Sequence, residues 1–220
     1  KWANSVFFDS IVMLNLVFYT NNNNTPIYLK ICISMNIIVM KFGGTSVSSI
    51  EKLKNIVNIV SHEVKKNKVV VVLSAMAGET NKLQGYLDHF SSQNSIESDL
   101  VLTSGEQVTI GLLSAALKNN EIKSIPLLGW QIPIITDENH EKAKILQIDK
   151  KRILKFFKKN DVIVLAGFQG ISLDGKITSL GRGGSDTTAV AIASTVDAER
   201  CDIYTDVDGV YTTDPNIDQN

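Results

Sequence analysis

Uninterrupted apolar runs, without alternating polar residues, indicate that two segments of this chain are strands buried on both faces. The runs are Val69–Leu73 and Val162–Leu165, and turn residues flank both. Strands of this kind belong to parallel sheets that helices cover on both sides. The intervening segments carry helical periodicity. The pattern therefore predicts an α/β fold, a three-layer αβα sandwich with a central, mainly parallel sheet.

Strands and helices are predicted to alternate from Met35 onward. We expect strands at Ile37–Phe42, Val69–Ser74, Ser124–Leu128, Asp161–Ala166 and Cys201–Thr205, and helices from about Ser49 and at Asn81–Phe90, Asp99–Lys118, Asp149–Phe157 and Ser185–Thr195. Ser48, with Glu51 three residues later, has the spacing of a helix capping box. The pair Asp174-Gly175 between two alternating segments predicts a β-hairpin.

Residues 1–34 differ from the rest of the chain. Their apolar run, Ile11–Tyr19, is shorter than the roughly 20 residues that cross a bilayer, and the tract Asn21–Asn24 follows it. The segment has three open interpretations: a translated stretch upstream of a natural start near Met35, a targeting segment, or a structured arm. We expect residues 1–34 to be a leader or upstream stretch outside the domain, and residues 35–220 to form one domain.

The composition gives no sign of several classes of partner and site. The 220 residues are 44% hydrophobic and 20% charged, as in a globular domain, and carry a net charge of -1. This charge gives no reason to expect a nucleic acid or membrane partner. Cys32 and Cys201 lie far apart, which indicates neither a disulfide framework nor a zinc site and fits the cytoplasm. His62, His89 and His140 share no metal-ligand spacing, and we interpret all three as surface residues.

The turn after the first predicted strand of the domain has features of an anion site. Its sequence is Lys41-Phe42-Gly43-Gly44-Thr45-Ser46-Val47. Adjacent glycines before a helix let backbone amides approach an anion, and Lys41 adds a full positive charge. Phosphate is the ligand that this pattern favours. A strand end followed by a plain surface turn has the same appearance, so the motif needs support from others.

A second glycine-rich segment, Gly181–Thr188, contains an arginine and an aspartate. Arg182 lies between glycines, where its guanidinium can reach a carboxylate with two parallel hydrogen bonds. A small acidic ligand would use such a group. Asp186 starts a predicted helix, where a carboxylate is also favourable simply because of the helix dipole.

A third segment, Thr103–Gln107, places a glycine and a glutamate in a helix. Gly105 costs the helix about 1 kcal/mol relative to alanine, so we expect another element to pack closely there. Glu106 is a candidate anchor for a ligand ammonium, or else part of a solvated helix face. Ser74 and Thr80 follow a buried strand, at the edge where open α/β sheets bind ligands.

The last segment, Tyr204–Pro215, is a strand that runs into an acidic loop. The spacing of its acids does not fit a calcium loop, and contact with a nucleotide is the better interpretation beside the other motifs.

One apparent motif is rejected. Gly170–Lys176 reads Gly-x-x-x-x-Gly-Lys, but Ile177 and a strand follow where a phosphate loop requires Ser or Thr and a helix.

These motifs, together with Gly167-Phe168-Gln169-Gly170, occur in the order found in aspartokinases, and the chain resembles that family from Ile37 to Pro215. The resemblance implies the amino-acid kinase fold. It also implies transfer of the ATP γ-phosphoryl group to the β-carboxylate of L-aspartate. The product would be 4-phospho-L-aspartate, the first intermediate of lysine, threonine and methionine biosynthesis. ATP and Mg²⁺ would be the cofactors.

The resemblance also implies residue roles. Lys41 and Asp186 would be catalytic, with Asp186 organising the lysine and the magnesium. The substrate aspartate would be held by Ser74, Thr80, Glu106 and Arg182. The nucleotide would be held by Lys41, Gly43, Gly44, Thr205, Asp206 and Tyr211.

Two departures from the family affect these expectations. Asn216 stands where the family commonly carries an arginine that contacts the nucleotide, and the family's kinase domain continues beyond Asn220. We therefore expect a domain that is incomplete at its C-terminal end and that belongs to a homo-oligomer when intact. Two alternatives stay open: another kinase of this fold, acting on glutamate, acetylglutamate or a nucleoside monophosphate, and a truncated fragment without activity.

Overall fold

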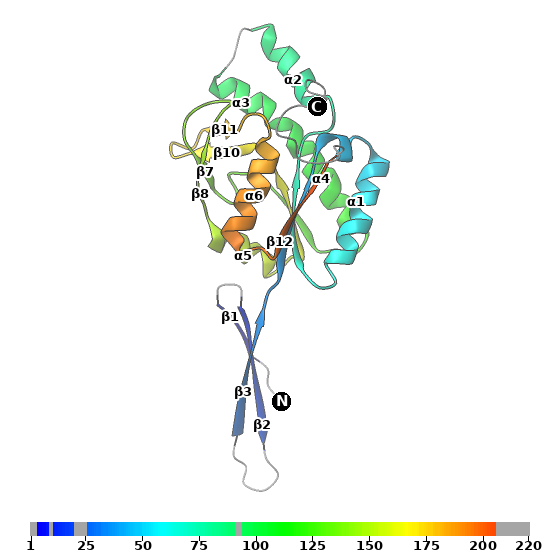
Figure 1. Cartoon of the computed structure of the whole chain (residues 1–220), viewed down its shortest axis with the longest axis vertical. Helices are drawn as coiled ribbons and strands as arrows, with labels where there is room; N and C mark the ends of the chain where they lie inside the picture. The colour runs from blue at the N-terminus through cyan, green and yellow to red at the C-terminus, as the bar shows by residue number, and fades with distance from the viewer. Residues whose placement is uncertain (1–3, 9–10, 20–25, 91–93, 206–220) are drawn as a thin grey trace, which may run out of the picture.

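A five-stranded parallel sheet forms the centre of the molecule (Figure 1). This computed structural model describes residues 4–8, 11–19, 26–90 and 94–205, with side chains from residue 35 onward. The strand order is β12-β4-β5-β9-β6, and every adjacent pair is parallel. The strands are β4 (Ile37–Phe42), β5 (Lys68–Leu73), β6 (Ser124–Leu127), β9 (Val162–Ala166) and β12 (Arg200–Tyr204).

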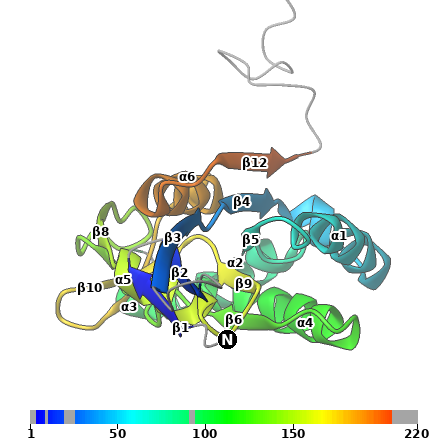
Figure 2. The same cartoon turned by 90° about the horizontal axis from the view of Figure 1, so that it is seen from below.

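Helices cover both faces of this sheet, which confirms the predicted three-layer sandwich. The described helices are α1 (Ile50–Glu63), α2 (Glu79–Asp88), α3 (Ile96–Leu102), α4 (Ser104–Asn119), α5 (Lys150–Phe157) and α6 (Gly184–Val196), with a short 3-10 helix η1 (Gly44–Val47). Of these, α1 and α4 cover one face of the sheet, and α5 and α6 cover the other. Alternate residues of β4 point to opposite faces of the sheet. Ile38 and Met40 pack in the core with α1 and α4, whereas Ile37 and Val39 pack with α5 and α6. Figure 2 shows α6 and α1 on opposite sides of β4.

A second, mixed sheet lies beside α3, in the order β11-β10-β7-β8 (Figure 1). Its strands are β7 (Ile134–Thr136), β8 (Ile145–Ile148), β10 (Gln169–Ser172) and β11 (Ile177–Ser179). β10 and β11 form the predicted antiparallel hairpin, and Gly175 in its turn has φ +81. β7 and β8 were not predicted, because three or four residues are too few to show a periodicity.

The N-terminal segment forms a sheet of its own. Strands β1 (Asn4–Phe8), β2 (Ile11–Tyr19) and β3 (Pro26–Ser34) are antiparallel neighbours in chain order and project away from the helices in Figure 1. The interpretation of residues 1–34 as a leader outside the domain stays a prediction.

Two local predictions were wrong in position. The N-cap of α1 is Ser49, whose hydroxyl accepts a hydrogen bond from Lys52 N at 3.3 Å. Ser48 instead donates its hydroxyl to the Thr45 carbonyl at 3.0 Å, because a 3-10 turn occupies the segment before α1. The predicted helix Asp99–Lys118 is two helices, α3 and α4, which meet at Thr103.

The α3–α4 stretch, Ile96–Asn119, is long and apolar enough to cross a membrane by length and composition alone, yet half of its most apolar window is buried inside the structure. A core helix of a soluble domain has the same properties, so this stretch is weak evidence for a membrane span.

His140 was interpreted as a surface residue, and this was wrong. Its side chain is 16% exposed, and its Nδ1 atom lies 2.7 Å from Oδ2 of the buried Asp99. Polar sequence neighbours suggested exposure, but the partner is 41 residues away in the chain. His62 and His89 are exposed, as expected.

Candidate functional site

The predicted catalytic and substrate-binding residues gather around one cavity of about 300 Å³. It lies where β4, β5 and β9 end, and parallel strands bring their carboxyl ends to the same edge of a sheet. The helices α4 and α6 also begin there. The predicted site residues that line the cavity are Lys41, Gly43, Gly44, Ser74, Thr80, Glu106, Arg182 and Asp186.

An ion pair between Lys41 and Asp186 forms one wall of the cavity. Lys41 follows Val39 by two positions and therefore points to the α6 side of β4, where Asp186 occupies the first turn of α6. Lys41 Nζ lies 2.6 Å from Asp186 Oδ1. That oxygen is buried and has no partner with hydrogen-bond geometry in the described residues, so we treat the contact as an ion pair. Lys41 itself is only 8% exposed.

The turn Gly43-Gly44 lies against the backbone of its neighbours. A Cβ added at Gly44 would come within 3.0 Å of the Ala75 carbonyl oxygen, so another backbone segment approaches this glycine closely. The neighbouring group is protein backbone, however. Gly43 N donates to the Tyr204 carbonyl at 3.4 Å, a long bond that leaves this amide weakly held. A role of these amides toward phosphate stays a prediction.

Glu106 presents a buried carboxylate to the cavity. The residue is 3% exposed, its Oε1 accepts a hydrogen bond from Ala75 N at 3.1 Å, and its Oε2 has no hydrogen-bond partner in the described residues. Burial raises the pKa of the Glu106 carboxyl to about 7, against the opposing effect of the Ala75 bond. A buried oxygen without a partner is costly, and a ligand cation would compensate it.

Gly105 confirms the predicted close packing beside Glu106. A Cβ at this position would lie 2.8 Å from the Ala75 Cβ atom, nearer than side chains approach. The glycine therefore lets the first turn of α4 reach the end of β5. This contact places Glu106 in the cavity.

Arg182 is exposed at the mouth of the cavity. It lies between Gly181 and Gly183, which have φ +78 and +73, a left-handed conformation that favours glycine. Among the described residues, the Arg182 guanidinium has no partner in a hydrogen bond or an ion pair. Ser74 is half-buried and Thr80 is exposed on the same cavity.

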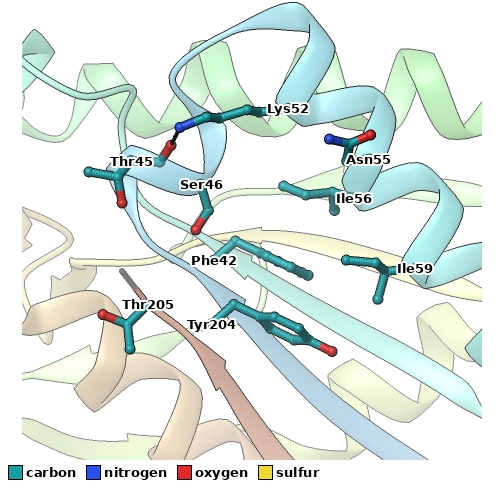
Figure 3. Close-up of a pocket in the computed structure, with 9 residues that line it drawn as sticks. All are labelled: Phe42, Thr45, Ser46, Lys52, Asn55, Ile56, Ile59, Tyr204 and Thr205. Atoms are coloured by element: carbon teal, nitrogen blue, oxygen red, sulfur yellow. Dashed lines mark hydrogen bonds between the residues drawn. The ribbon is translucent and has the colours of Figure 1, made fainter. Parts of the chain in front are cut away.

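A second cavity, of about 310 Å³, lies on the α1 side of β4 (Figure 3). The rings of Phe42 and Tyr204 stack there with centroids 4.4 Å apart and an interplanar angle of 15°. Lys52 Nζ donates to the Thr45 carbonyl at 2.7 Å. Thr205, predicted to contact the nucleotide, lines this cavity and not the one around Lys41. The other two predicted nucleotide contacts, Asp206 and Tyr211, lie outside the described residues.

Phe168 and Ser185 also line the cavity around Lys41, and sequence reasoning gave them no role. Phe168 has a positive φ of 65, unusual for a residue with a side chain. Its ring fills the space beside Gly184, where an added Cβ would come within 2.8 Å of Phe168 Cδ2. The available signal was the segment Gly167-Phe168-Gln169-Gly170, which did not reveal the direction of the ring.

Comparison with known proteins identifies relatives over most of the chain. Residues 36–220 match the amino acid kinase family. The chain is 49% identical over 191 residues to the aspartokinase of Rickettsia conorii, which covers 84% of this chain and 48% of that protein. It is 51% identical over 183 residues to the aspartokinase of Geobacillus stearothermophilus, covering 82% and 45%.

Solved structures give the same relationship. The structure is similar to E. coli aspartokinase III in complex with aspartate and ADP, with a TM-score of 0.69 and 25% identity, over 83% of this chain and 52% of the other. It is also similar to the aspartate kinase from Synechocystis, with a TM-score of 0.67 and 40% identity, over 82% and 30%. The chain thus spans about half the length of the curated relatives it matches.

Proposed function

Because this chain belongs to the amino acid kinase family, we propose that it carries the acceptor and phosphoryl-binding part of an aspartate kinase. The reaction is transfer of the ATP γ-phosphoryl group to the β-carboxylate of L-aspartate. One observation carries the proposal: Lys41, Glu106 and Arg182 line a single cavity of about 300 Å³. Its cationic and anionic groups match an amino acid with two carboxylates, and the aspartokinase relatives support the same substrate.

The amino acid is held by groups of opposite charge. Glu106 takes the ammonium, because its buried Oε2 has no partner in the described residues. Arg182 takes the α-carboxylate through two parallel hydrogen bonds, and the hydroxyls of Ser74 and Thr80 add further contacts. Held by both groups on its α-carbon, the substrate directs its side-chain carboxylate toward Lys41.

Lys41 reduces the main obstacle to the reaction. The β-carboxylate is already an anion at neutral pH, so attack on phosphorus needs no general base. Repulsion between this carboxylate and the phosphates opposes approach, by about 4 kcal/mol for unit charges 4 Å apart at an effective dielectric near 20. The Lys41 ammonium, fixed by Asp186 at 2.6 Å, offsets this repulsion and stabilises the charge of the transferring group.

The residues present also fit a magnesium ion that is held mainly by ATP. Among the described residues no cluster of three or more His, Cys, Asp or Glu side chains could hold a metal alone. Mg²⁺ bound by nucleotide phosphates and water needs only one or two carboxylates, and the 45% exposed side chain of Asp186 supplies one. When bound, the ion neutralises phosphate charge.

The proposal predicts a defined substrate preference. With ATP and Mg²⁺, we expect ADP to form with L-aspartate and at least about tenfold more slowly with L-glutamate or N-acetyl-L-glutamate, because a site with fixed polar partners at both ends of its ligand discriminates against a longer one. A coupled ADP-release assay with each acceptor measures this. Faster turnover with glutamate or acetylglutamate would favour the other kinases of the fold, and binding of ATP without any turnover would favour an inactive fragment.

Arg182→Ala is expected to weaken aspartate use roughly 10- to 100-fold while the KM for ATP changes little, because hydrogen bonds to charged groups contribute about 1.5–3 kcal/mol. Steady-state kinetics with each substrate varied in turn measures the split. Arg152→Ala is the matched control, since Arg152 lies over the Phe156 ring on α5, away from the cavity. A selective loss of ATP affinity would contradict the assignment.

A further inference from the structure

A buried aspartate outside the cavity connects the two elements that carry Glu106 and Arg182. Asp99, on α3, is 0% exposed. Its Oδ1 accepts hydrogen bonds from Ser179 Oγ at 2.5 Å and from Glu141 N at 2.9 Å. Its Oδ2 lies 2.7 Å from His140 Nδ1. Both carboxylate oxygens are therefore occupied, by β11 and by the loop between β7 and β8.

The side chain of Asp99 fixes the position of the backbone that carries Arg182. Ser179 ends β11, and the turn with Gly181 and Arg182 follows two residues later. The loop lies directly against that turn: Ala143 N donates to the Ser179 carbonyl at 2.9 Å, and a Cβ added at Gly181 would come within 2.8 Å of the Glu141 carbonyl oxygen. A shift of the loop or of β11 must therefore move the backbone that carries Arg182.

The backbone carbonyl of Asp99 fixes the start of α4, the helix that carries Glu106. This carbonyl accepts hydrogen bonds from Thr103 N at 3.0 Å and from Thr103 Oγ1 at 2.7 Å. Thr103 is the N-cap of α4, and Glu106 lies in the first turn of that helix. α3 contacts β11 of the second sheet and leads directly into α4, as such a connector requires (Figure 1).

We propose that Asp99 is a positioning residue that sets the separation of Arg182 and Glu106, and thereby the fit of these two side chains to the α-carboxylate and α-ammonium groups of the amino-acid ligand. The inference rests on the proposed function, because that function assigns the α-carboxylate to Arg182 and the ammonium to Glu106. A displacement of about 1 Å far from the reacting atoms is enough to cost on the order of 100-fold. A carboxylate with three fixed partners across two elements resists such a displacement.

The test compares graded variants by their KM for L-aspartate and for ATP. Asp99→Ala is expected to raise the KM for aspartate on the order of 10- to 100-fold and that for ATP less than about twofold. Asp99→Asn keeps an acceptor for Ser179 and Glu141 and is expected to restore most of the loss. Ser179→Ala removes a single bond and is the variant to use if Asp99→Ala fails to fold.

Asp137→Asn is the matched control. The Asp137 carboxylate accepts hydrogen bonds from Asn139 and Lys144 within the same loop, and none of its hydrogen bonds in the described part of the chain reaches α3. Its substitution is expected to change the KM for aspartate less than about threefold, because the connection to α3 remains. An effect as large as that of Asp99→Ala would show that any weakening of the loop suffices, and would overturn the special role of Asp99.

A double-mutant cycle separates positioning from a general structural effect. In an Arg182→Ala background, Asp99→Ala should add less than about threefold to the KM for aspartate, since the group that it positions is gone. Full additivity, or equal losses for aspartate and ATP, would overturn the inference. Absence of aspartate-dependent turnover in the unsubstituted protein would instead count against the proposed function.

Discussion

Replacement of Lys41 by alanine is expected to lower turnover roughly 100- to 1000-fold, because removal of one donor aimed at developing charge costs about 2.7–4 kcal/mol in other enzymes. The structure gives the physical reason in this chain. The Lys41 ammonium lies 2.6 Å from Asp186 Oδ1, and the whole residue is only 8% exposed. Little water is therefore present to replace its charge. Single-turnover measurement with saturating ATP and aspartate isolates the chemical step.

Lys68→Ala supplies the matched control for this prediction. Lys68 is also a lysine of the central sheet, at the start of β5, and its Nζ lies 2.7 Å from Asp161 Oδ1. It does not line the cavity. Its substitution is expected to leave turnover within about twofold, because a partly exposed ion pair contributes little. Equal activity of Lys41→Ala and Lys68→Ala would remove Lys41 from the site.

The fold was largely predictable because its central strands show their burial in the sequence. Val69–Leu73 and Val162–Leu165 are apolar at every position, as is typical of strands in a sheet that is covered on both faces. Gly105 was also informative, because a residue that is unfavourable in a helix indicates a close neighbour. The hairpin turn at Gly175 has its own local signal.

What the sequence did not reveal depends on contacts between distant residues. His140 is half-buried because it contacts Asp99, and the polar neighbours of each residue carry no sign of the other. The junction of α3 and α4 was missed because the apolar pattern continues through Thr103. Thr205 directly follows β12, and Lys41 lies on the neighbouring β4, but neither motif indicates that they line different cavities.

Glu106→Gln is expected to weaken aspartate binding roughly 150- to 5000-fold, because loss of one partner from a buried ion pair costs about 3–5 kcal/mol. Gln keeps an acceptor for Ala75 N, so the local structure is preserved. Calorimetric titration with L-aspartate measures the affinity, and a normal thermal unfolding curve verifies folding.

The raised pKa of Glu106 also makes a prediction for pH. The pKa is about 7 in the folded chain, against 4.5 for an ordinary Glu, so the folded state binds the proton more tightly. This stabilisation is complete below pH 4.5 and is lost as the pH rises through 7, by about 3 kcal/mol in total. Without aspartate, Glu106→Gln is therefore expected to be more stable than the unsubstituted chain at pH 8.

Aspartate binding should reverse this titration. An ammonium beside Glu106 favours the ionised carboxylate, so binding at pH 6 releases most of one proton from a group whose free pKa is about 7. Affinity should then rise with pH up to about 7 and level off above it. Titrations at pH 6 in two buffers with different ionisation enthalpies count the protons, and Glu106→Gln should abolish the release. Equal proton release by both proteins would show that the ammonium binds elsewhere.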